Sequence, residues 1–115
     1  MTILDTEAAN DQPDHTDYGV DNAARWGIGF PVGGIVCFEE GSKFSTVVGS
    51  LDDRTFGERV EIDLQPGDVV LFHGAKVHRG ARYMIRNRRL HFYAACRGLK
   101  VPENTTYPVE VPGVR

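Results

Sequence analysis

The chain has 115 residues, a net charge of −3 and ordinary shares of apolar and charged residues, which together indicate one globular domain with a modest core. Its two cysteines are too few for a disulfide scaffold. No apolar run approaches the roughly 20 residues of a membrane span. The opening MTILDTEAAND lacks the basic and apolar regions of a secretory signal, so we expect a cytoplasmic protein with no membrane partner.

Charge is unevenly distributed along the chain. Residues 1–68 contain fourteen acidic and four basic side chains, whereas residues 69–102 contain eight basic side chains and no acidic one. Such a cluster is compatible with an anionic substrate, either a small molecule or a protein side chain, although a solvated basic strand is the commoner cause. Nucleic acid is the least favoured partner, because the aromatic pattern of known nucleic-acid modules is missing.

The predicted elements are strands separated by turns. Residues 1–14 are polar and acidic and predict a flexible lead-in, and the Gly- and Asn-rich residues 18–29 predict a loop. Strand-like runs follow at short intervals, at residues 35–38, 43–48, 59–64, 69–72 and 88–95. We therefore expect residues 15–98 to form an all-β, antiparallel sandwich or barrel, and residues 99–115 to form an irregular tail.

Two of these runs carry more detailed signals. The run RVEIDL at 59–64 alternates polar and apolar residues, as a half-buried strand does, and Gln65-Pro66-Gly67-Asp68 after it predicts a turn. The run VVLF at 69–72 is apolar on both faces, which predicts that both faces are covered. A two-sheet sandwich covers one face only, so the other face needs helices, another chain or additional sequence.

His15 and Asp17 are the first candidate metal ligands. In an extended segment, residues i and i+2 point to the same side, so both side chains can reach one ion. On its own this spacing is weak evidence, because a solvated histidine in an acidic loop is the commoner explanation.

His78 strengthens the metal interpretation because it follows a turn and a buried strand. Two histidines and one carboxylate on one face of an ion form the facial triad typical of non-haem iron(II) oxygenases. For a lone histidine, a hydrogen bond to backbone would be the favoured explanation.

Arg89 follows His78 within the last predicted strand. Period two places Arg89, His91 and Tyr93 on one face, with Arg88 and its alternate neighbours on the other. An inward-pointing arginine needs an anionic partner, and a carboxylate bound by both of its oxygens matches it best. Arg88 takes this role if the register shifts by one residue.

These motifs, in this order, resemble the iron(II)/2-oxoglutarate-dependent oxygenase superfamily, and most closely its phytanoyl-CoA-hydroxylase-like and prolyl-hydroxylase-like members. The segments are HTDY, GSKFSTVVGS, LQPGDVVLFHGAKVHRGARY and RNRRLHFYA, and the likeness covers residues 12–97. The resemblance implies a double-stranded β-helix (jelly-roll) core. It also implies that His15, Asp17 and His78 bind Fe(II) and that Arg89 holds the far carboxylate of 2-oxoglutarate. The implied reaction hydroxylates a substrate that the sequence does not name and releases succinate and CO2.

The chain also departs from this family. Its members usually carry helices and strands before the H-x-D motif, whereas here the motif begins at residue 15. The chain is therefore interpreted as a fragment without that N-terminal portion, a reduced member, or half of a homo-oligomer. Two alternatives stay open: a cupin-type metal-binding protein, and a non-catalytic binding domain of the same fold.

Overall fold

The structure is a computed structural model, and it describes residues 2–8, 11–19, 29–50, 57–99 and 107–109. Within these residues the regular elements are all β-strands. No helix in the described part of the chain is long and apolar enough to cross a membrane. The expectation of an all-β chain is therefore confirmed.

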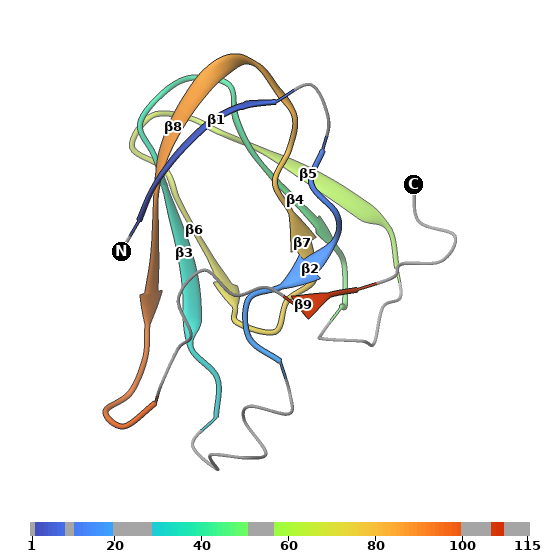
Figure 1. Cartoon of the computed structure of the whole chain (residues 1–115), viewed down its shortest axis with the longest axis vertical. Coiled ribbons are helices and arrows are strands. Elements are labelled where there is room, and N and C mark those ends of the chain that lie inside the picture. The colour runs from blue at the N-terminus through green and yellow to red at the C-terminus, as the bar shows by residue number, and fades with distance from the viewer. Residues whose placement is uncertain (1, 9–10, 20–28, 51–56, 100–106, 110–115) are drawn as a thin grey trace.

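The strands form two antiparallel sheets around a common core (Figure 1). The four-stranded sheet has the order β1-β8-β3-β6, with the bounds β1 Thr2–Ala8, β8 Tyr83–Ala94, β3 Val32–Cys37 and β6 Val69–His73. The five-stranded sheet has the order β5-β4-β7-β2-β9, with the bounds β5 Arg59–Leu64, β4 Ser42–Val47, β7 His78–Arg79, β2 His15–Thr16 and β9 Tyr107–Pro108.

Two strands lie where the sequence predicted irregular chain. β1 falls within the expected flexible lead-in and pairs with β8, placing Ile3 opposite Leu90. β9 falls within the expected tail and pairs with β2, placing Thr16 opposite Tyr107. Both strands form by pairing with distant segments, which a local pattern does not reveal.

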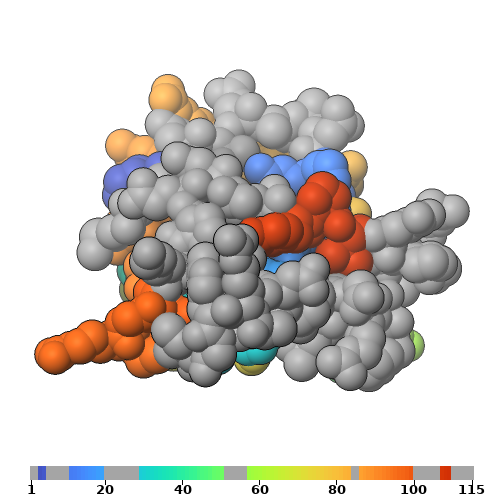
Figure 2. Space-filling view, turned by 60° about the horizontal axis from the view of Figure 1, so that its bottom comes forward, coloured from blue at the N-terminus to red at the C-terminus, as the bar shows by residue number. Residues whose placement is uncertain are grey.

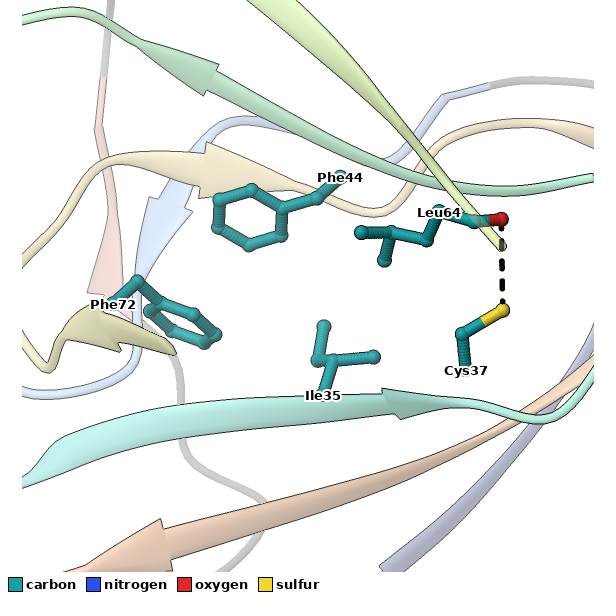
Figure 3. Packing of buried hydrophobic residues seen from close by; sticks show 5 residues of the cluster. All are labelled: Ile35, Cys37, Phe44, Leu64 and Phe72. Carbon is teal, nitrogen blue, oxygen red and sulfur yellow. Dashed lines mark hydrogen bonds between the residues drawn. The ribbon is translucent and has the colours of Figure 1, made fainter. Parts of the chain in front are cut away.

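The core lies between the sheets and draws one or more side chains from four strands. Its members are Ile35, Cys37, Phe44, Leu64 and Phe72, each at most 8% exposed. Figure 3 shows their side chains converging from opposite sides, with the Cys37 thiol directed at the Leu64 carbonyl at 3.6 Å. Burying a side chain as large as phenylalanine contributes about 1.5–3 kcal/mol, so the two rings are major contributors to the association of the sheets.

Two consecutive glycines in β3 make room for aromatic rings. Gly33 lies opposite Phe72 of β6, and Gly34 lies opposite Phe92 of β8. A Cβ at Gly33 would come within 2.4 Å of the Phe72 ring, and one at Gly34 within 2.2 Å of the Phe92 ring. Each ring therefore packs directly over the backbone of β3, one on the inner face of the sheet and one on the outer face.

The predicted turn between β5 and β6 is confirmed. Gly67 has a φ of 93°, the Asp68 amide donates to the Gln65 carbonyl at 2.9 Å, and the Gln65 amide donates to the Asp68 carboxylate at 2.8 Å. Glycine supplies the positive φ that the third position of such a turn requires.

The burial expected for two of the runs differs from the structure. In β5 the strand is present, but Val60 and Ile62 are 37% and 39% exposed, because β5 is the edge of its sheet. In β6, Phe72 is buried while Val69 and Leu71 are 51% and 63% exposed. The outer face of β6 therefore lacks the cover that its apolar sequence predicted, within the described residues.

Candidate metal centre

The H-x-D segment is held between two other strands. His15 in β2 lies directly opposite His78 in β7, and on its other side opposite Pro108 in β9. In Figure 2 the red segment that contains β9 lies against the blue segment that contains β2. Two residues far apart in sequence thus stand side by side because their strands are neighbours in one sheet.

Because β2 and β7 are short, contacts outside the strands fix the position of β2. Asp14 pairs with Arg59 of β5 at 2.6 Å, with both side chains largely buried. Asp11 pairs with Arg79 at 3.2 Å, and the Gln12 amide donates to the Gly80 carbonyl at 2.9 Å. Residues 11–14 are therefore anchored to the sheet, which places His15 at its observed position.

His15, Asp17 and His78 come together as the sequence predicted. Their ligand atoms all lie within 4.8 Å of one another. The Nε2 atom of His15 lies 3.5 Å from Asp17 Oδ1, and the Nε2 atom of His78 lies 3.5 Å from Asp17 Oδ2. Asp17 and His78 are buried, at 5% and 6% exposure, and the group therefore forms a compact site of two imidazoles and one carboxylate.

Backbone carbonyls orient both imidazole rings. His15 Nδ1 lies 3.0 Å from the Pro13 carbonyl oxygen, and His78 Nδ1 lies 2.9 Å from the Lys76 carbonyl oxygen. A carbonyl only accepts, so each Nδ1 donates its proton there, and in the neutral ring Nε2 keeps a lone pair. This arrangement is typical of metal-binding histidines, whose second nitrogen is held by a backbone or carboxylate acceptor.

The ionisation of the three groups reflects burial and their mutual contacts. Burial raises the pKa of Asp17, but its close contacts with the His15 and His91 imidazoles and the nearby imidazole charges outweigh it and hold that pKa below its usual range. Burial lowers the pKa of His15, yet its contacts with Asp17 and Pro13 raise it overall. For His78, burial dominates and lowers the pKa.

The donor set fits a divalent metal ion. Asp17 Oδ2 is buried and makes no hydrogen bond of ordinary geometry within the described residues. Two imidazole lone pairs and a carboxylate facing one another are mutually repulsive, and a cation between them removes that repulsion. Imidazole and carboxylate ligands without thiolate suit iron and similar ions rather than a structural zinc site of cysteines.

β8 brings two further side chains to the site. His91 Nε2 lies 3.5 Å from Asp17 Oδ2, from the opposite sheet. Burial and the negative charge of Asp17 raise the pKa of Tyr93. The sequence placed both residues on the face that carries Arg89 but gave them no role, because their proximity to Asp17 depends on how the two sheets face each other.

Arg89 lies on the inner face of β8, as the alternation predicted. It is 5% exposed, donates to the Asn87 side-chain oxygen at 2.8 Å, and lies 4.5 Å from the centre of the Tyr83 ring. Arg88 points outward and pairs with Glu39 at 2.8 Å, with its side chain 62% exposed. Of the two arginines, Arg89 is therefore the one positioned between the sheets.

Comparisons with protein-family models, curated proteins and solved structures find no match for this chain. The chemistry of the site is therefore inferred from its own geometry.

Proposed function

We propose that this chain is the core of an iron(II)- and 2-oxoglutarate-dependent dioxygenase with a double-stranded β-helix fold. The observation that carries the proposal is the group formed by His15, Asp17 and His78, in which both histidines present an Nε2 lone pair to a buried carboxylate. Three protein ligands on one side of an ion leave the remaining positions open for co-substrate and oxygen.

The strand pairing supports the jelly-roll assignment. β4 pairs with β5, β3 with β6, β2 with β7, and β1 with β8. This is the pairing of one long hairpin that has been folded over itself, with alternate strand pairs entering opposite sheets. A jelly roll pairs eight strands in two sheets in this way, and the oxygenase and cupin folds share that architecture, so β1 to β8 would form it here and β9 would be an addition.

Each proposed residue has a separate task. His15, Asp17 and His78 would hold the iron, which when bound supplies the oxygen chemistry that couples decarboxylation of 2-oxoglutarate to hydroxylation. Arg89 would pair with the far carboxylate of 2-oxoglutarate, for which its planar guanidinium is well shaped. The rings of Phe44 and Phe72, packed 5.5 and 4.8 Å from the His78 ring, would limit access of water to the ligands.

The substrate class follows less directly from the residues. An anionic small molecule or side chain would suit the basic segment after residue 69, but two of those bases are already neutralised, Arg79 by Asp11 and Arg88 by Glu39. A metal-binding protein of cupin type is the second candidate, because His91 adds a third imidazole beside the carboxylate.

An anaerobic titration with Fe(II) and 2-oxoglutarate tests the proposal. We expect a saturable visible charge-transfer band in the parent chain, loss of the band in His78→Ala, and retention of the band in His73→Ala. His73 is a suitable control because it is exposed and lies on β6, in the sheet opposite to that of His78. Metal binding without dependence on 2-oxoglutarate would favour the cupin-type candidate, and no metal binding would refute both.

A further inference from the structure

His91 stands beside the proposed metal ligands without belonging to their group. In the described part of the chain, the ligand atoms that all lie within 4.8 Å of one another come from His15, Asp17 and His78, and His91 is not among them. Its Nε2 nevertheless lies 3.5 Å from Asp17 Oδ2, the oxygen that lacks an ordinary hydrogen bond. His91 therefore approaches the carboxylate rather than the centre of the ligand group.

The three imidazoles differ in which ring nitrogen can donate a proton to Asp17. His15 and His78 use the Nδ1 proton for the Pro13 and Lys76 carbonyls, so in neutral form neither can donate from Nε2 to Asp17. Within the described residues no hydrogen bond reaches Nδ1 of His91. His91 is thus the imidazole whose Nε2 proton is available to the carboxylate.

Neighbouring rings fix the orientation of His91. The Phe72 ring is nearly parallel to the His91 ring, with 8° between their planes and 6.4 Å between their centres. Tyr93 meets the His91 ring edge-on at 4.7 Å. The strand register adds to this, because His91 lies opposite Ile35 in β3.

We propose that His91 is a positioning residue that donates a hydrogen bond from Nε2 to Asp17 Oδ2 when the metal is bound, so that the four-stranded sheet orients a ligand carried by the five-stranded sheet. This inference rests on the proposed metal centre. A separation of 3.5 Å is long for a hydrogen bond, but contacts of this kind commonly shorten when the ligand binds. A ligating carboxylate is normally hydrogen-bonded through its other oxygen, and losing that partner typically weakens metal binding about 10- to 100-fold.

The test compares two substitutions at His91 with the same two at His73. His91→Leu removes the donor, whereas His91→Gln carries an amide N–H that reaches about as far as Nε2. We expect the dissociation constant for Co(II) or Fe(II) to rise about 10- to 100-fold in His91→Leu and to stay close to the parent value in His91→Gln. The Co(II) absorption spectrum should be altered in His91→Leu alone, while His73→Leu and His73→Gln match the parent.

The outcomes distinguish this inference from the proposed function. If the parent binds metal and His91→Leu binds it equally well, the positioning role is refuted while the metal centre stands. If His91→Gln binds as weakly as His91→Leu, the imidazole acts as a ligand and not as a donor, which also refutes the inference. If the parent binds no metal, the proposed centre fails and the inference fails with it. Thermal melting of each metal-free variant identifies any loss of fold.

Discussion

Replacing Arg89 with methionine should weaken 2-oxoglutarate binding and leave the fold intact. Arg89 is 5% exposed, and a charge-assisted pair with a carboxylate in such a place is worth about 2–3 kcal/mol. This corresponds to a dissociation constant about 30 to 150 times larger. The loss of stability should be small, because the Asn87 side-chain oxygen that Arg89 contacts also accepts a hydrogen bond from Ser42 at 2.9 Å.

The assay is an anaerobic titration of the Fe(II)-loaded protein with 2-oxoglutarate, followed by its charge-transfer band. Arg88→Met is the matched control: its ion pair with Glu39 is exposed, and exposed pairs contribute about 0–1 kcal/mol. Arg89→Lys should fall between the parent and Arg89→Met, because lysine keeps the charge and loses the planar fork. Equal effects at positions 88 and 89, or a larger effect at Arg88, would refute the assignment of the anchor.

Three further predictions concern the scaffold and the metal. Gly33→Ala should lower the free energy of unfolding by about 1–3 kcal/mol, because its Cβ would press on the buried Phe72 ring. Gly34→Ala should lower it by less, because the Phe92 ring opposite Gly34 is only half-buried. Urea denaturation of both variants checks which of the two is the less stable. Arg59→Met should destabilise the chain by about 3 kcal/mol and weaken metal binding, because it leaves the largely buried Asp14 carboxylate without its partner; an unchanged melting temperature would contradict this. Metal at about 100 times its dissociation constant should stabilise the chain by about 2.7 kcal/mol, and a chelator should reverse the rise in melting temperature seen by calorimetry.

The local features of this fold were predictable from sequence because they depend on neighbouring residues. The turn at Gly67 follows from proline and glycine in consecutive positions, and the inward face of β8 follows from the alternation that carries Arg89. The same alternation allowed Arg88 to be the inward residue, and only the pairing of β8 with β3 and β1 decides between the two registers. β1 was missed for the same reason, since it forms by pairing with β8.

The candidate site also has a part that the sequence predicted and a part that it did not. The spacing of His15 and Asp17 predicts that their side chains share a face, and their proximity in the structure agrees with it. The contribution of His91 was not predictable, because no sequence spacing relates it to Asp17. Its position depends on how far one sheet lies from the other, which is set by the core residues that pack between them, such as Phe72.

The short strands that carry the ligands explain why the site depends on contacts elsewhere. β2 and β7 have two residues each, and His15 and His78 form the single residue pair recorded between them. A ladder this short contributes little rigidity, since isolated strand pairs are at best marginally stable. The Asp14–Arg59 ion pair and the contact of Gln12 with Gly80 hold the segment from outside the ladder. Substitutions at these residues should therefore change metal affinity although none of them reaches the metal. The size of the change should depend on how much of the anchoring contact is lost, and not on how far the residue lies from the ligands.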